Sequence, residues 1–203
     1  MKIKLYKDDI PDNLNLGNSI AIDTEAMGLN HQRDRLCLIQ LSNGNGVCHL
    51  IKINNSKDKP DNLLKIMKNN KILKIFHYAR FDVGILNYTY KLNIKNIYCT
   101  KIASKLARTF TDKHGYKDIC KDLLNINIIK EEQTSDWGAE KLTLSQQKYA
   151  ASDVLHLHQL MDKLNKILIR ENRMDLAKSC FSFIEHRVNL DLSGWSEMDI
   201  FKH

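Results

Sequence analysis

Residues 19–29 read SIAIDTEAMGL, and this stretch decides the fold because an apolar, partly β-branched segment runs directly into two acids. Its composition predicts a buried strand over residues 19–23. Side chains alternate across a strand, so Asp23 and Glu25 project from one face, about 6 to 7 Å apart. Acids at a strand end are often only a solvated turn, but the apolar turn at residues 27–29 favours a site at the edge of a sheet.

Two more strands are predicted at residues 35–42 and 47–53, and Asn-Gly-Asn-Gly at residues 43–46 predicts the hairpin between them. With the first strand they form an antiparallel meander. The remaining patterns predict a strand at 72–77 and helices at 60–69, 79–88, 101–109, 115–124, 144–168 and 171–187. We therefore expect an α/β fold, a mixed sheet flanked by helices, in a single domain over residues 1–203.

The composition is that of a globular protein. The chain has 203 residues, 43% of them hydrophobic, with only 8 Gly and 2 Pro, which argues against disordered and collagen-like classes. Its start has no apolar signal region, and no stretch approaches the about 18 apolar residues of a spanning helix. We expect a soluble, cytoplasmic protein with no membrane partner.

The cysteines and the net charge say less about the function than the motifs do. Five cysteines without C-x-x-C spacing favour reduced core residues over disulfides or a zinc ribbon. The formal charge of +7, from 31 basic and 24 acidic residues, favours a polyanionic partner such as nucleic acid. A generic lysine-rich surface explains the charge equally well.

Two later segments carry further candidate site residues. Asp82 lies where the predicted strand at 72–77 runs into a helix, and an acid there is also explained by the helix dipole. Tyr149 and Asp153 are four residues apart on a predicted helix, so they share one face. A Tyr–Asp pair of this kind is more often a surface hydrogen bond.

The order of these elements resembles one family. D-T-E-x-x-G-L at a strand end, F-D at a strand-to-helix turn and Y-x-x-x-D on a late helix resemble the three motifs of DEDD-superfamily 3′-to-5′ exonucleases, tyrosine subtype. Ser135-Asp136-Trp137 and residues 142–155 are similar to the stretch around the third motif of ribonuclease D. The resemblance covers about residues 19–160 and implies a ribonuclease H-like fold and hydrolysis of nucleic acid to 5′-mononucleotides.

Carried over to this sequence, the resemblance implies that Asp23, Glu25, Asp82 and Asp153 hold two divalent metal ions, Mg²⁺ or Mn²⁺, and that Tyr149 positions the attacking water. Carboxylates suit these hard cations, and the cations offset the repulsion between four acids. A phenol of ordinary pKa about 10 is a better positioner than base.

The substrate contacts implied are less specific. By analogy, Met27, Gly28 and Leu29 abut the terminal base, and His77 and Arg80 flank the second motif. Phosphate ligands are expected from a later loop, at Arg108, Lys113, His114 and Lys117. An apolar turn and solvated charges remain the alternative interpretations.

The short chain, its T-D-K-H-G loop and its tail D-L-S-G-W-S-E-M-D-I-F resemble the NanoRNase C group of alphaproteobacteria. That resemblance implies very short RNA, down to dinucleotides, as substrate and a homo-oligomer of eight subunits. The tail predicts an arm over residues 189–203, packed either on its own subunit or on a neighbour. The alternatives are a general exonuclease trimming RNA or DNA 3′ ends and a non-catalytic scaffold, which the presence of all five site residues disfavours.

Overall fold

A six-stranded mixed sheet forms the centre of the computed structural model, which describes residues 1–54, 59–128 and 135–203. The strands lie in the order β1-β4-β3-β2-β5-β6. Their bounds are β1 (Lys2–Lys7), β2 (Ser19–Ala26), β3 (Leu36–Ser42), β4 (Val47–Lys52), β5 (Leu73–Phe76) and β6 (Ile97–Cys99). Strands β2, β3 and β4 are antiparallel, which confirms the meander, and the other pairings are parallel.

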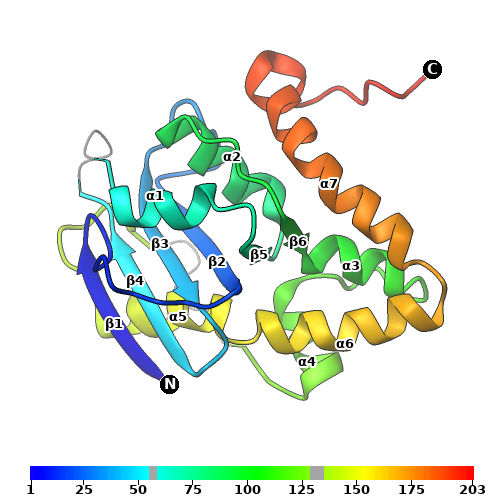
Figure 1. Ribbon diagram of the computed structural model, residues 1–203, viewed down its shortest axis with the longest axis horizontal. Coiled ribbons are helices and arrows are strands. Elements are labelled where there is room, and N and C mark those ends of the chain that lie inside the picture. Colours follow the sequence, from blue (N-terminus) through cyan, green and yellow to red (C-terminus); the bar gives the residue numbers. More distant parts are fainter. Residues whose placement is uncertain (55–58, 129–134) are drawn as a thin grey trace.

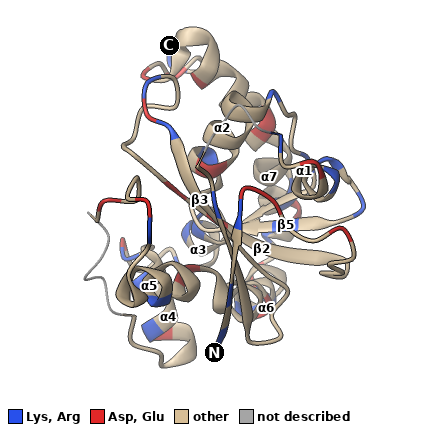
Figure 2. Ribbon diagram, turned by 90° about the vertical axis from the view of Figure 1, so that its left-hand side faces the viewer, with Lys and Arg blue, Asp and Glu red and all other residues tan. Residues whose placement is uncertain are grey.

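Helices cover both faces of this sheet (Figures 1 and 2). Helices α1 and α2 lie on one face, α5 lies on the other, and α3, α4, α6 and α7 pack beyond β6. Their bounds are α1 (Asp61–Lys68), α2 (Ala79–Tyr90), α3 (Thr100–Ala107), α4 (Tyr116–Leu124), α5 (Leu144–Leu155), α6 (Leu157–Arg170) and α7 (Met174–Leu190). The expected α/β fold, a mixed sheet flanked by helices, is confirmed.

Strand β2 leaves the core where its acids begin. Ile20, Ala21 and Ile22 are fully buried, because helices cover both faces of the sheet at this point. Asp23 and Glu25 are only half-buried, and the pairing register with β3 shifts just after Glu25. Such bulges bend a strand and re-aim its side chains, often beside functional sites.

Two strands were not predicted. In β1, lysines are interspersed with apolar side chains, and the strand lies exposed at the sheet edge beside β4. Such an edge strand lacks the continuous apolar run that marks the central strands. Strand β6 has only three residues, too few for a periodicity to show.

The predicted helices at 144–168 and 171–187 need correction. His156 takes a backbone conformation that interrupts the first, giving α5 and α6. Helix α7 runs on to Leu190, and a helical turn at Asp191–Trp195 continues it until Gly194, whose φ of 103° only glycine adopts readily. The expected arm therefore begins as a continuation of α7, and the exposed chain follows Trp195.

Two expectations about composition can be compared with the structure. Four of the five cysteines are buried, Cys180 is half-buried and all five are free, which agrees with reduced core residues. Among the helices of the described residues, none is long and apolar enough to cross a membrane.

The loop after β2 docks closely on α2 at Gly84. A Cβ atom added to Gly84 would lie 2.5 Å from Cε1 of His31, which is closer than real contacts allow. The His31 ring also packs against Phe81, with ring centroids 5.0 Å apart. Gly84 therefore allows the His31 ring to approach α2 closely, and a larger residue would displace that ring.

We expect Gly84→Ala to lower the free energy of unfolding by about 1 to 3 kcal/mol, because the added methyl overpacks this contact. Urea unfolding measures the change. The same substitution made in a His31→Ala background should cost clearly less, because the clashing ring is gone. Equal costs in both backgrounds would contradict the assigned contact.

Candidate active site

Three carboxylates from two elements converge at the end of β2. One oxygen from each of Asp23, Glu25 and Asp153 lies within 4.8 Å of the others. Asp23 and Glu25 share the face of β2 that α5 covers, and Asp153 projects from α5 toward them. This is the same-face arrangement that the sequence predicts.

Asp82 reaches the same region from the opposite face of the sheet. It lies in the first turn of α2, where its Oδ1 accepts a hydrogen bond of 2.7 Å from Oγ1 of Thr24. Thr24 stands between Asp23 and Glu25 in sequence and points to the other face. The charge of Asp82 also raises the pKa of Asp23 and of Glu25. Asp82 is therefore a fourth carboxylate close to the other three.

Burial and mutual repulsion make this cluster a poor place for bare negative charge. Burial raises the pKa of Asp23 well above its ordinary value, and Asp82, Asp153 and Glu25 raise it further. Burial, with Asp153 and Asp82, raises the pKa of Glu25 to about 9. Burial raises the pKa of Asp82 to about 7, although the Thr24 hydrogen bond opposes this. A set of carboxylate oxygens under such repulsion fits hard divalent cations such as Mg²⁺ or Mn²⁺.

Tyr149 lies one helical turn before Asp153 on α5. Burial raises the pKa of its phenol, and Asp153, Glu25 and Asp23 raise it further. The hydroxyl therefore keeps its proton at neutral pH. Its ring packs 5.9 Å from that of Trp137, which holds the side chain beside the carboxylates.

The start of α5 is fixed by the segment that resembles ribonuclease D. Thr143 and Gln146 form a capping box, and Nε2 of Gln146 donates to Ser135 Oγ (2.7 Å) and to the Asp136 carbonyl (3.1 Å). The buried Nζ of Lys52 donates to the carbonyl of Trp137 at 2.8 Å. These bonds tie α5 to β4 and thereby set the height of Tyr149 and Asp153 over the sheet.

Sequence reasoning missed two side chains of this site. Thr24 was not predicted as a site residue, because the acids on either side of it drew the assignment. Strand alternation alone places its side chain on the other face of the sheet. Gln40 on β3 lies directly opposite Asp23, is fully buried, and has neither amide atom hydrogen-bonded within the described residues. Only the strand register, which sequence does not fix, brings it there.

The turn after β2 presents its apolar side chains to solvent. Met27 is 53% exposed and Leu29 85% exposed, as a surface that receives a ligand requires. A Cβ atom added to Gly28 would lie 2.3 Å from Oδ2 of Asp34, so a larger residue fits there only if that carboxylate moves. His77 follows β5, and its Nδ1 lies 2.9 Å from Oγ1 of Thr100. The base contact of Met27, Gly28 and Leu29 and the substrate contact of His77 stay predictions.

The loop expected to bind phosphate is arranged differently at one residue. Arg108 is only 2% exposed, donates to the Lys113 carbonyl at 2.8 Å and pairs with Asp122. The expectation that Arg108 contacts phosphate is therefore corrected: its guanidinium holds the loop together. His114 is half-buried, with Nδ1 2.9 Å from Oγ of Ser104, whereas Lys113 and Lys117 are exposed.

Arg80 at the start of α2 is tied to the C-terminal turn. Its Nε and Nη2 donate to the Asp191 carboxylate at 2.6 and 2.8 Å. Arg187 pairs with the same carboxylate at 2.7 Å and donates to three backbone carbonyls of the turn that follows. Asp191 is the first residue of the quoted tail, but it was not predicted as a site residue, because it is distant in sequence from the three exonuclease motifs.

The raised pKa of Glu25 gives a pH test of the cluster. The native state holds this proton between the ordinary value of 4.5 and about 9, whereas the unfolded chain loses it near 4.5. Stability of the metal-free protein therefore falls as the pH rises through this interval. We expect the melting temperature of Glu25→Gln in EDTA to fall less than that of the wild type between about pH 5.5 and 8.5. If the melting temperatures of the two proteins fell in parallel with pH, this would contradict the raised pKa of Glu25.

Comparisons with known proteins agree with this geometry. A family model described as a 3′-5′ exonuclease matches residues 7–169. The solved structure of NrnC from Brucella melitensis is 47% identical, with a TM-score of 0.97 and 100% of both chains covered. Further structures of that protein, at 47% and 46% identity, are described as bound to pGG (TM-score 0.94, 100% and 99% covered) and with bound Mg²⁺ (TM-score 0.93, 100% of both chains).

Longer relatives match over part of their length. Ribonuclease D from Gluconacetobacter diazotrophicus is 31% identical over 160 residues, which are 79% of this chain and 40% of the relative. DNA polymerase I from Aquifex aeolicus is 33% identical over 157 residues, 77% of this chain and 25% of that protein. The chain thus spans less than half of these relatives. With the match over residues 7–169, these findings show that the chain belongs to the 3′-5′ exonuclease family, of the ribonuclease D and NrnC type.

Proposed function

We propose that this chain is a metal-dependent 3′-to-5′ exoribonuclease that hydrolyses short oligoribonucleotides, down to dinucleotides, to 5′-mononucleotides in the cytoplasm. The observation that carries the proposal is the convergence of Asp23, Glu25 and Asp153 within 4.8 Å, next to Asp82 and Tyr149. The pGG bound by NrnC, a protein 47% identical over its whole length, supports the short substrate.

The carboxylates Asp23, Glu25, Asp82 and Asp153 would hold two divalent metal ions. The Mg²⁺ in an NrnC structure supports this assignment, and the oxygen donors and raised pKa values of the cluster fit it. When bound, such ions stabilise negative charge on the attacking and leaving oxygens of a phosphodiester. The single domain over residues 1–203 provides every one of these ligands.

The other side chains bind and orient. The protonated hydroxyl of Tyr149 is a hydrogen-bond partner that holds a water molecule in line with the scissile bond. The exposed Met27 and Leu29, with Gly28 between them, provide an apolar surface for the terminal base. His77, Arg80, Lys113 and His114 provide positive or hydrogen-bonding groups for the phosphates.

Replacing one acid should remove the activity. Asp23→Asn, Glu25→Gln, Asp82→Asn or Asp153→Asn each deletes one anionic metal ligand, so we expect turnover of a labelled dinucleotide to fall at least about 1,000-fold while circular dichroism is unchanged. EDTA should have the same effect, reversed by added Mg²⁺ or Mn²⁺. Near wild-type rates in two of these variants, or after complete chelation, would refute the assignment.

Tyr149→Phe separates positioning from binding. The variant keeps the aromatic ring and its packing on Trp137 and loses only the hydroxyl. We therefore expect kcat to fall about 10- to 1,000-fold with little change in KM, measured on the same dinucleotide. A tenfold rise in KM at unchanged kcat would instead assign the hydroxyl to RNA binding.

A general exonuclease that trims RNA or DNA 3′ ends is the second candidate. The likeness to ribonuclease D and DNA polymerase I favours it. The C-terminal segment decides between short-RNA hydrolysis and general trimming if it joins subunits that restrict access to the site. Four of its apolar side chains are each at least 43% exposed: Trp195, Met198, Ile200 and Phe201. Exposed apolar groups of this size typically anchor interfaces. We propose a homo-oligomer, an octamer by family likeness, whose neighbours limit access to the site.

Chain length and assembly are tested together. We expect kcat/KM to fall from a 2-mer to a 20-mer RNA, and light scattering to report an oligomer. Trp195→Ala with Phe201→Ala should give smaller species and weaken the length preference. Leu144→Ala, which removes a 75% exposed apolar side chain from α5, is the control. A monomeric wild type would end the assembly proposal, and faster cleavage of the 20-mer or of DNA would favour the trimming exonuclease.

A further inference from the structure

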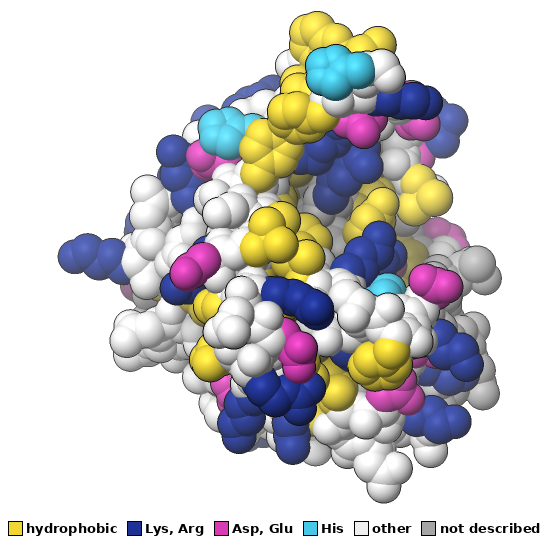
Figure 3. Space-filling model, turned by 90° about the vertical axis from the view of Figure 1, so that its right-hand side faces the viewer, with side chains coloured by type: hydrophobic (Ala, Val, Ile, Leu, Met, Phe, Trp, Pro, Cys, Tyr) yellow, Lys and Arg dark blue, Asp and Glu magenta, His cyan; other side chains and the backbone are white. Residues whose placement is uncertain are grey.

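A hollow of about 590 Å³ lies between α3 and α7, next to the start of α2. Four basic side chains line it: Arg80 from α2, Lys101 and Lys105 from α3, and Arg187 from α7. No Asp or Glu is among its lining residues. Figure 3 views this side of the molecule, where Lys and Arg side chains lie next to hydrophobic ones beneath the C-terminal end. The volume is that of a small-molecule site.

Half of the positive charge of this hollow is offset by acids just outside it. Asp191 pairs with both Arg80 and Arg187, and Glu197 also lies close enough to Arg80 to raise its pKa. None of the ion pairs within the described residues involves Lys101 or Lys105. The Nζ of Lys101 lies over the Tyr78 ring, 4.2 Å from its centre. The two lysines that remain carry two positive charges, which match an anion of about two negative charges, such as a phosphomonoester.

The rest of the lining is apolar and partly aromatic. Tyr78 and Phe183 are 48% and 37% exposed, and Ile102 and Ile184 also line the hollow. The Phe183 ring also contacts the rings of His186 and Phe201, with centroids 5.9 Å apart in each pair. Exposed aromatic faces beside cations are the usual platform for a nucleobase. A ligand that matches both halves of the hollow carries a phosphate at one end and a planar ring at the other.

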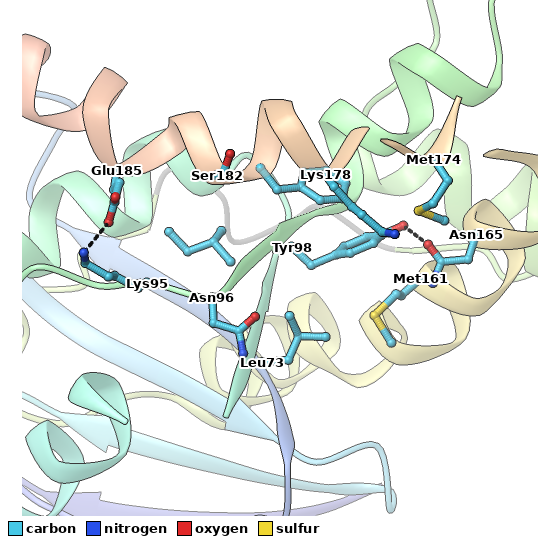
Figure 4. Close-up of a pocket in the computed structure, with 12 residues that line it drawn as sticks. Leu73, Lys95, Asn96, Tyr98, Met161, Asn165, Met174, Lys178, Ser182 and Glu185 are labelled. Atoms are coloured by element: carbon cyan, nitrogen blue, oxygen red, sulfur yellow. Dashed lines mark hydrogen bonds and ion pairs between the residues drawn. The ribbon is translucent and has the colours of Figure 1, made fainter. Parts of the chain in front are cut away.

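A neighbouring groove differs from the hollow because its polar side chains are paired with one another (Figure 4). It lies between β6, α6 and α7, and its polar groups already have partners in the chain. Lys95 pairs with Glu185 at 3.6 Å, and the Tyr98 hydroxyl donates to Asn165 at 2.9 Å. This groove offers no unpaired cation beside an aromatic face, so it carries no comparable ligand chemistry.

We propose that the hollow between α3 and α7 is a second nucleotide site that binds a nucleoside 5′-monophosphate. Lys101 and Lys105 bind the phosphate, and Tyr78 and Phe183 pack on the base. None of the four carboxylates lines this hollow. The hollow is nevertheless next to them in the fold, because Tyr78 and Arg80 lie four and two residues before Asp82. This ligand class is also the product of the proposed reaction, although the site is inferred from its own charge and shape.

Binding is tested without turnover, in EDTA, so that failure of the exonuclease assignment leaves the test intact. Isothermal titration calorimetry with adenosine 5′-monophosphate should give one site per chain. Adenosine, which lacks the phosphate, and inorganic phosphate, which lacks the base, should each bind at least about tenfold more weakly. Lys101→Gln with Lys105→Gln should weaken binding by about tenfold or more, and Phe183→Ala should also weaken it, since stacking on one base contributes a similar factor.

Two controls locate the bound nucleotide. Lys163→Gln with Lys166→Gln removes the same charge from exposed positions of α6 and should leave the affinity unchanged. Cys180 lines the hollow and is the one cysteine that is not buried. Alkylation of Cys180, followed by mass spectrometry, should therefore slow when adenosine 5′-monophosphate is present. The double lysine variant on α3 should lose this protection.

Three results would overturn the proposal. Unchanged affinity in Lys101→Gln with Lys105→Gln would move the nucleotide elsewhere. Protection of Cys180 by an RNA 10-mer but not by the mononucleotide would make the hollow part of an RNA path. Protection of Cys180 without any ligand in the oligomer, lost on dilution to smaller species, would give the hollow to a second copy of this chain.

Discussion

The mutual repulsion of four neighbouring carboxylates is the constraint on which the rest of the structure depends. Asp23 and Glu25 on β2 face Asp153 on α5, and Asp82 on α2 adjoins them. Each would move into water if its element were free to shift, because burial and like charge oppose ionisation together. The fold must therefore hold β2, α5 and α2 against this repulsion, and an oxygen-rich site for divalent cations is the result.

Each element is held by a different device. Strand β2 is anchored because its residues before Asp23 are buried on both faces. Helix α5 is capped at Thr143 and tied to β4 through Lys52, so its two site residues keep their height over the sheet. Helix α2 is set by the Thr24 hydrogen bond to Asp82 and by the close contact at Gly84. These polar and steric contacts supply geometry that hydrophobic burial alone leaves unspecified.

Sequence predicted what depends on local pattern and missed what depends on register. The strand-end pair Asp23 and Glu25 and the helical pair Tyr149 and Asp153 follow from periods of two and of nearly four, so their faces were predictable. Gln40 was not, because only pairing between strands places it opposite Asp23. Arg108 has the same composition signal as a phosphate ligand, and only tertiary packing buries it against Asp122.

The C-terminal turn joins the site to the face beyond it. The side chain of Asp191, only 5% exposed, is held by Arg80 from α2 and by Arg187 from α7. Arg80 therefore belongs at once to the start of the helix that carries Asp82 and to the basic hollow beside α3. The bonds of Arg80 to Asp191 and to the Ser196 carbonyl therefore fix the first turn of α2, which carries Asp82, against the C-terminal turn.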